Sequence, residues 1–194
     1  MIHSLKLASP PLIIYPQSFA ELQELRHCKT EFIELGEACF TPAVFTFSPP
    51  LRGYIISRLT TEGDIAGMHS AFWIHTGIST PALARELNIS RQDEKRRRPQ
   101  SRRRFPAAHI ERIGGQLLTT KERTAIDLLR VDLIAGSEKI SALLEAGSSL
   151  EAIYACSKEI RGATGIRQAR KAVAQFIESG VYKNLESKSD SRTK

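Results

Sequence analysis

The sequence predicts a mixed α/β protein of the α+β kind, with short strands and helices in its N-terminal two thirds and a C-terminal helical layer. Of its 194 residues, 41% are apolar and 25% are charged, which is ordinary for a globular protein with a sizeable core. Short β-like runs bounded by Gly and Pro lie before about residue 120, and helical periodicity dominates after it. Strands followed by helices are typical of α+β domains.

The first expected elements are a capped helix and three short strands. Ser18, followed three residues later by Glu21, forms a capping box that opens a helix over residues 18–29. We expect Gly36 to supply a positive φ in a hairpin turn, because Gly adopts that conformation without steric cost. The three β-like runs cover residues 31–35, 38–40 and 43–47.

The middle of the chain is predicted to alternate helices and strands. The expected helices cover residues 51–59 and 69–76, and the strands cover 64–68, 110–113 and 116–118. Two interpretations compete between them. Residues 80–87 have helix propensity and could begin a helix-turn-helix, but Pro99 cuts short any recognition helix. Residues 87–91 could instead form a strand.

Four helices are predicted toward the C-terminal end. A second capping box, Thr119 with Glu122, opens the first of them at about Lys121. The four helices cover residues 121–134, 137–146, 149–159 and 166–179, and Gly136, Gly147 and Gly162–Gly165 separate them. The polar residues 183–194 are expected to be a disordered tail.

The positive charge of the chain is concentrated in one segment. The sequence has 28 Lys and Arg against 21 Asp and Glu, a net charge of +7. Seven of the basic residues and no acidic ones lie between Lys95 and Arg104, and removing these seven leaves 21 basic against 21 acidic residues. We call residues 95–104 the basic segment. Because the remainder is neutral, the charge indicates one localised contact rather than a general affinity for polyanions.

The basic segment is predicted to contact nucleic acid. Six of its seven cations are Arg, whose planar forks match phosphate groups and guanine edges. A solvated loop, a contact with an anionic membrane surface and a nuclear-localisation signal are the alternatives. The predicted DNA-binding residues are Lys95, Arg96, Arg97, Arg98, Arg102, Arg103 and Arg104.

Other candidate groups favour structural roles. Arg123 and Asp127 lie four apart on a predicted helix and can form an ion pair, which is usually worth a few tenths of a kcal/mol. The five histidines are expected to pack or cap, and Cys28, Cys39 and Cys156 to be buried free thiols. The glycines at 162–165 could hold an anion at a helix N-terminus or simply shape a turn. No nucleophile or nucleotide-binding motif occurs, and we expect neither a metal nor a cofactor.

Three motifs resemble the AbiEi-type antitoxin family, the repressors of type IV toxin–antitoxin systems, and especially its actinobacterial branch. Ser70–Gly77 (SAFWIHTG) is similar to the helix SAAxLHG of that family. Arg104–Ile110 (RFPAAHI) is similar to its stretch R-[LF]-P-x-x-[DH]-[IV], and Leu118–Leu128 (LTTKERTAIDL) is similar to VTxxxRTxxDL. The motifs keep the order and spacing of the family and cover about a third of the chain.

The resemblance implies a bacterial cytoplasmic, non-enzymatic regulator that binds DNA at its own promoter. A nucleotidyltransferase-type toxin from the same operon is an implied partner, and no membrane association is implied. It also favours a strand over residues 87–91. We expect structural roles for the motif residues Ser70, His75, Pro106, Thr119, Arg123, Thr124 and Asp127. A nuclease-related enzyme or remnant, dependent on Asp127 or Asp64, and a protein-interaction module without DNA binding remain alternatives.

The resemblance also suggests how the chain divides. The winged helix of the family is longer than the stretch before Glu31, so we expect residues 1–50 to form a truncated or partial winged-helix-like region. Residues 51–182 correspond to the antitoxin α/β domain, and residues 183–194 to the tail. Many relatives continue into a nuclease domain resembling very-short-patch-repair endonucleases, which we do not expect here.

Overall fold

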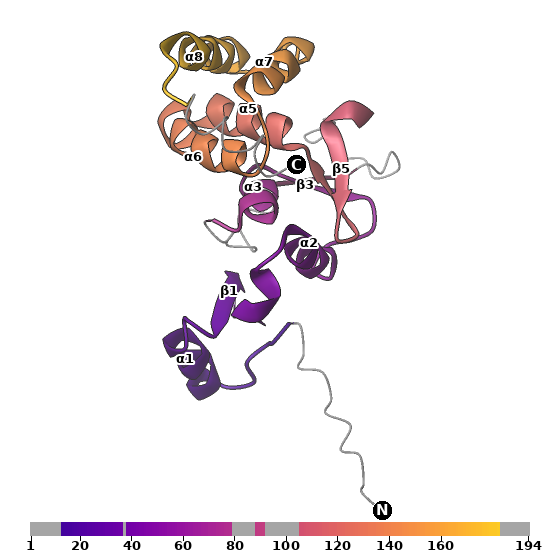
Figure 1. Cartoon of the computed structure of the whole chain (residues 1–194). Helices are drawn as coiled ribbons and strands as arrows, with labels where there is room; N and C mark the ends of the chain where they lie inside the picture. Colours follow the sequence, from indigo (N-terminus) through magenta and orange to yellow (C-terminus); the bar gives the residue numbers. More distant parts are fainter. Residues whose placement is uncertain (1–12, 37, 79–87, 92–104, 183–194) are drawn as a thin grey trace, which may run out of the picture.

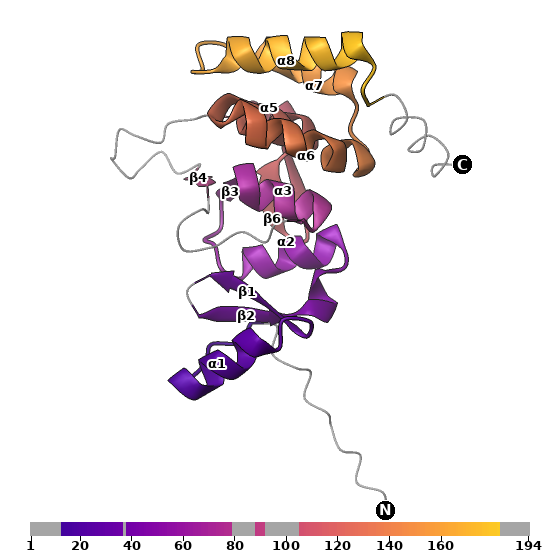
Figure 2. The same ribbon diagram turned by 90° about the vertical axis from the view of Figure 1, so that its left-hand side faces the viewer.

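The protein is a mixed α/β structure built as a stack of layers along one direction (Figures 1 and 2). The computed structural model describes residues 13–36, 38–78, 88–91 and 105–182. A helix and a hairpin lie at one end, a four-stranded sheet with two helices lies in the middle, and two helical layers lie at the other end (Figure 2). The predicted fold class and the C-terminal helical layer are therefore confirmed.

The N-terminal layer consists of α1 (Phe19–His27), β1 (Phe32–Gly36) and β2 (Cys39–Pro42). The Ser18 side chain accepts a hydrogen bond from the Glu21 amide, so the predicted cap is confirmed. The two strands pair antiparallel as predicted, but within the described part of the turn it is Ala38 that has a positive φ, 52°.

Residues 43–47 were expected to be a strand, and that expectation is wrong. They contain a short 3-10 helix, η1 (Ala43–Thr46), followed by α2 (Pro49–Ser57). Two prolines occupy the first positions of α2, where a missing amide hydrogen costs nothing. The β-branched and aromatic letters of 43–47 suggested a strand, but no neighbouring strand pairs with them in the described residues.

A four-stranded sheet forms the centre of the molecule, in the order β4-β3-β6-β5. The inner strands β3 (Asp64–Gly67) and β6 (Gln116–Thr119) are parallel, and β4 (Asn88–Arg91) and β5 (Ile110–Ile113) are antiparallel outer strands. The predicted strand at 87–91 is confirmed, which removes the helix-turn-helix interpretation there. The two glycines between β5 and β6 both have positive φ, as the predicted two-residue turn requires.

Helix α3 (Met68–Thr76) joins the two hydrophobic cores of the protein. Its Phe72 packs in the core of the C-terminal helices, whereas Trp73 and Ile74 pack in the core of α2, the hairpin and the sheet. Six consecutive residues of this helix, 70–75, are buried. A helix that is apolar all round belongs inside a protein, and α3 occupies that place between the sheet and the helical layers (Figure 2).

The helical layers contain α5 (Lys121–Val131), α6 (Leu133–Glu145), α7 (Leu150–Glu159) and α8 (Ile166–Ser179). The predicted N-terminal cap of α5 is wrong. The cap of α5 is Thr120 rather than Thr119: its hydroxyl accepts from the Arg123 amide, while Glu122 accepts from the Ser148 hydroxyl instead of closing a capping box.

The break between α5 and α6 falls at Asp132 rather than at Gly136. The Asp132 carboxylate accepts hydrogen bonds from the amides of Ile134 and Ala135, so it caps a new helix. Gly136 lies inside α6, where a Cβ atom would come within 2.8 Å of the Leu129 backbone. The glycine therefore allows the two helices to pack closely and does not separate them.

Candidate functional site

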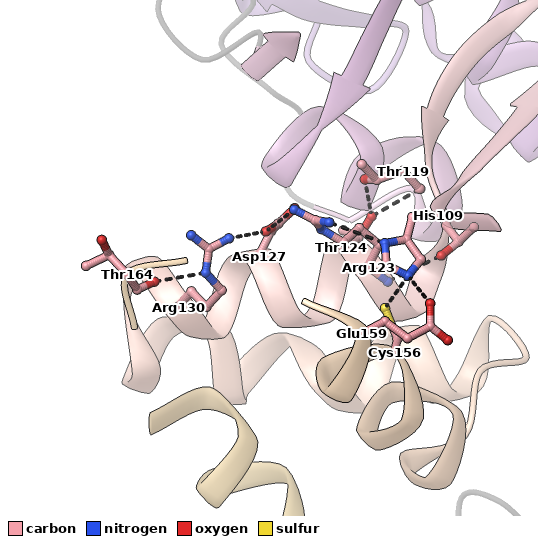
Figure 3. A network of polar contacts seen from close by, with 10 residues as sticks. His109, Thr119, Arg123, Thr124, Asp127, Arg130, Cys156, Glu159 and Thr164 are labelled. Atoms are coloured by element: carbon pink, nitrogen blue, oxygen red, sulfur yellow. Dashed lines mark hydrogen bonds and ion pairs between the residues drawn. The ribbon is translucent and has the colours of Figure 1, made fainter. Parts of the chain in front are cut away.

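The most prominent polar cluster in the described residues is a buried network centred on α5 (Figure 3). Asp127 accepts from Arg123 Nε at 2.8 Å and from Arg123 Nη2 at 3.2 Å, and it accepts from Arg130 Nη1 at 2.5 Å. The side chains of all three residues are less than a tenth exposed. The predicted Arg123–Asp127 pair is therefore present, but it is a buried two-arginine cluster and not a surface pair.

A second group of contacts connects the strand β6 to α3 and α5. The Thr119 carbonyl accepts from His75 Nε2 at 2.9 Å and from the Thr124 hydroxyl at 3.2 Å. The two threonine hydroxyls also lie 2.7 Å apart. Either hydroxyl can be the donor in this contact. All three residues are buried, so these bonds tie three elements together in the interior.

His109 extends the network toward α7 (Figure 3). Its Nδ1 lies 3.3 Å from Arg123 Nη1, and its Nε2 lies 2.8 Å from Glu159 Oε2. A guanidinium can only donate, so Nδ1 is the acceptor and Nε2 carries the hydrogen directed at the carboxylate. The Cys156 Sγ lies 3.7 Å from the same Nε2. His109 thus joins α5 to α7.

Phe105 connects this network to the basic segment. The Arg123 guanidinium carbon lies 4.6 Å from the centre of the Phe105 ring, within the range of a cation–π contact. Phe105 directly follows Arg104 in the chain. Three residues of 3-10 helix, η2 (Ala107–His109), then lead to β5. Phe105, the residue directly after the basic segment, therefore lies against the buried cluster on α5.

Burial decides the protonation of two groups near the network. Burial lowers the pKa of His75 to about 4, so the ring is neutral at neutral pH. Burial also raises the pKa of the Cys156 thiol to about 12, against the opposing effect of the nearby Arg123 charge. A thiol of this kind is protonated and a poor nucleophile. The Cys156–His109 contact is therefore suited to packing and not to thiolate chemistry.

The predicted DNA-binding residues Lys95–Arg98 and Arg102–Arg104 lie outside the described residues, as do the helix considered over residues 80–87 and the predicted tail at 183–194. The structure does describe the strands on either side of the basic segment. The preceding strand β4 and the following strand β5 occupy the two outer positions of the sheet.

The structure brings most of the motif residues together. Arg123, Asp127, Thr119, Thr124 and His75 all belong to the buried contacts described above. The other two motif residues lie at their margins: Ser70 is buried in α3, and Pro106 is exposed just before η2, where its carbonyl accepts from the His109 amide.

Sequence reasoning missed the partners that complete the network. Arg130 could have been found, because it lies three residues after Asp127 on the same helix. His109 was assigned a general packing role without a partner. The three remaining residues, Cys156, Glu159 and Thr164, come from segments that no sequence pattern links to α5.

The loop before α8 favours the turn-shaping interpretation of its glycines. The Thr164 carbonyl accepts from Arg130 Nε at 2.9 Å. At Gly165, which has φ of 76°, a Cβ atom would lie 2.5 Å from the Arg130 carbonyl oxygen. The loop thus rests directly on the end of α5.

Cys28 is exposed, so the expectation of three buried thiols is correct only for Cys39 and Cys156.

An open groove of about 670 Å³ lies between α1 and the hairpin. Its lining includes Leu25, Phe32 and Phe40 together with Arg26, which pairs with Glu34 at 2.8 Å. Within the described ranges, no group of three or more His, Cys, Asp or Glu side chains is arranged to hold a metal ion.

Comparison of the chain with known proteins found no matching family model, curated protein or solved structure. Across the described part of the chain, no helix combines the length and the apolar character needed to cross a membrane.

Proposed function

We propose that this protein is a non-enzymatic, DNA-binding transcriptional regulator of the AbiEi antitoxin type, which contacts DNA through its basic segment. One observation carries the proposal: the entire excess of positive charge lies in residues 95–104. Arg-rich segments neutralise phosphates and release counterions from DNA, which supplies most of the affinity of a sequence-independent contact. The resemblance of the three sequence motifs to those of antitoxins supports the antitoxin part of the proposal, and it implies a nucleotidyltransferase-type toxin as the operon partner.

The described residues on either side of the basic segment support this proposal. The segment follows an outer strand, β4, in the chain and is directly followed by Phe105, whose ring lies against Arg123. Arg123 in turn is fixed by Asp127 and contacts His109. The residue that directly follows the seven cations therefore contacts α5, a helix with seven buried residues.

The test is a salt titration of binding to the promoter region of the gene itself, measured by fluorescence anisotropy. If six or seven cations meet phosphates, log K should fall against log salt with a slope of about −5 to −6. Replacing Arg97, Arg98, Arg102 and Arg103 with Ser should weaken binding and flatten the slope by about one unit per lost contact.

A matched control separates this contact from bulk charge. Lys158, Arg161, Arg167 and Lys171 are exposed on or beside α7 and α8, and replacing all four with Ser changes the net charge by the same amount. The control should lose far less affinity than the basic-segment variant. If the slope of log K against log salt is the same in the two variants, the basic segment is not part of the interface.

The same samples distinguish the alternative functions. Mg²⁺-dependent cleavage of the DNA that is lost in Asp64→Ala would indicate a nuclease. Asp127 is a poor candidate for holding Mg²⁺, because both of its oxygens already accept from buried arginines. Copurification with a protein partner and no DNA binding at any salt concentration would indicate an interaction module.

A further inference from the structure

The outer edge of β1 offers backbone groups that β2 does not use. Phe40 lies opposite Glu34 in the hairpin, and its amide and carbonyl both bond to Ile14 on the other side of β2. Glu34 and Phe40 are therefore a pair without hydrogen bonds between them, and the N–H and C=O of Glu34 point away from β2. Two residues earlier, the C=O of Phe32 points the same way. Among the described residues, none of these three groups has a hydrogen-bond partner.

The groove between α1 and the hairpin, which we call the α1 groove, reaches this edge. Its lining includes three consecutive residues of β1, namely Phe32, Ile33 and Glu34, as well as Leu25 and Phe40. Side chains of successive strand residues point to opposite faces, so a space that touches all three also reaches the backbone of the strand. The α1 groove lies at the end of the stack opposite the helical layers (Figure 2). It therefore joins an apolar space to an open strand edge.

The charges of the lining favour an occupant that carries a carboxylate. Arg26 and Lys29 contribute two cations, and the one carboxylate of the lining, Glu34, is paired with Arg26 at 2.8 Å. Lys29 is exposed and has no counter-charge among the lining residues. Glu24 and Glu31 are close in the sequence, but neither of them lines the groove. A carboxylate of the occupant would therefore meet a cation that the protein itself does not neutralise.

We propose that the α1 groove docks an extended, acidic segment of another protein, which adds a strand to the outer edge of β1 and places a carboxylate against Lys29. Unpaired backbone groups along a strand edge recognise an extended chain, and the apolar lining accepts its alternate side chains. The terminal segments of this chain fit poorly. Residues 1–12 contain no Asp or Glu, and residues 183–194 contain four basic residues against two acidic ones. The interaction does not depend on the DNA-binding proposal, since it needs no nucleic acid.

The first experiment measures, by fluorescence anisotropy without DNA, the binding of a labelled heptapeptide of alternating Glu and Val to the full chain. A contact of this size lies below the range of stable interfaces, so the Kd should be on the order of 10–100 µM. The same peptide with Lys in place of Glu should bind at least about tenfold more weakly. N-methylation at alternate residues tests the strand pairing. Methyl groups on the set of amides that faces β1 should abolish binding, and methyl groups on the other set should not.

Two substitutions at one position give matched variants of the protein. Glu34→Pro removes the outward N–H but no hydrogen bond between β1 and β2, and Pro is tolerated at edge positions of this kind. It should raise the Kd at least about tenfold. Glu34→Ala loses the same carboxylate but keeps the N–H, so it should not weaken binding. Lys29→Glu should also raise the Kd about tenfold, whereas Lys171→Glu, an equal change of charge on α8, should leave it unchanged.

The methylated peptides need no substitution in the protein, so they test the proposal even if Glu34→Pro is destabilised. The proposal is wrong if the wild type does not bind the acidic peptide, if both methylated peptides bind equally well, or if Glu34→Ala loses as much affinity as Glu34→Pro. It is also wrong if the wild type dimerises without peptide and Glu34→Pro abolishes the dimer, because a second copy then occupies the edge of β1.

Discussion

Replacement of Asp127 by Asn tests whether the buried network on α5 stabilises the protein far more than its sequence spacing indicates. An isolated pair of this spacing on a helix surface is worth about 0.3–0.5 kcal/mol. In the structure, Asp127 is the only carboxylate that the network places between Arg123 and Arg130, and all three side chains are less than a tenth exposed. The Asn variant keeps the shape of the side chain but leaves two buried cations without their shared counter-charge.

The magnitude follows from the cost of an uncompensated buried charge. Breaking a buried ion pair by removing one partner costs about 3–5 kcal/mol. Three hydrogen bonds of 2.5 to 3.2 Å lose their charged acceptor in this variant. A protein of this size loses about 2–4 °C in melting temperature per kcal/mol. Asp127→Asn should therefore melt roughly 6–20 °C below the wild type.

Thermal denaturation gives the melting temperature and urea denaturation gives the free energy of unfolding. Both are followed by the fluorescence of Trp73, which is the single Trp of the chain and is fully buried. Glu34→Gln is the matched control, because Glu34 pairs with Arg26 at 2.8 Å while both side chains are more than a third exposed. The control should lose about 0–1 kcal/mol. If Asp127→Asn loses no more free energy of unfolding than Glu34→Gln, removing the carboxylate of the buried network costs no more than breaking an exposed ion pair.

Three further predictions concern packing, pH and thiol reactivity. Gly136→Ala should destabilise the protein by about 1–3 kcal/mol in the same urea assay, although Ala favours helices, because its Cβ would lie 2.8 Å from the Leu129 backbone; a stabilised variant would contradict this close packing. Burial lowers the pKa of His75 to about 4, below its unfolded value of 6.5, so the unfolded chain binds the proton first and stability should fall as the pH drops from about 6.5 to about 4. The loss of unfolding free energy should be on the order of 3 kcal/mol. His75→Gln, which can still donate to the Thr119 carbonyl, should reduce this dependence of stability on pH; an unchanged pH dependence would exclude His75 as its cause. Native protein should react with a thiol reagent at Cys28 alone, since Cys39 and Cys156 are buried and burial raises the pKa of both thiols; rapid labelling of Cys156 before unfolding would show that the α7 contact opens.

Local sequence signals predicted the positions of most elements. Ser18, the glycine pair at Gly114-Gly115 and the apolar periodicity after Lys121 each act over a few residues, so their effects can be read from the chain. The predictions were wrong at positions where residues far away in the chain determine the local structure. At Gly136 the neighbouring backbone of α5 explains the glycine, and residues 43–47 lack a neighbouring strand among the described residues.

For the candidate site too, contacts between neighbouring residues could be predicted from the sequence, and contacts between distant segments could not. The Arg123–Asp127 spacing predicted a contact but not its burial, and burial raises the expected cost of removing one partner about tenfold. The sequence motifs contained His109 and Thr124, yet their partners Glu159 and Thr119 could be identified only after β6 and α7 had been placed beside α5.

The sequence by itself determined the fold class, the approximate positions of the helices and strands, and the concentration of the net charge in residues 95–104. These properties depend on composition and on short-range periodicity. Only the tertiary structure decided that Asp127 is shared by two buried arginines, that Phe105 lies against this cluster, and that a groove lies between α1 and the hairpin. Burial depends on which segments surround a side chain, and those segments are far apart in the chain.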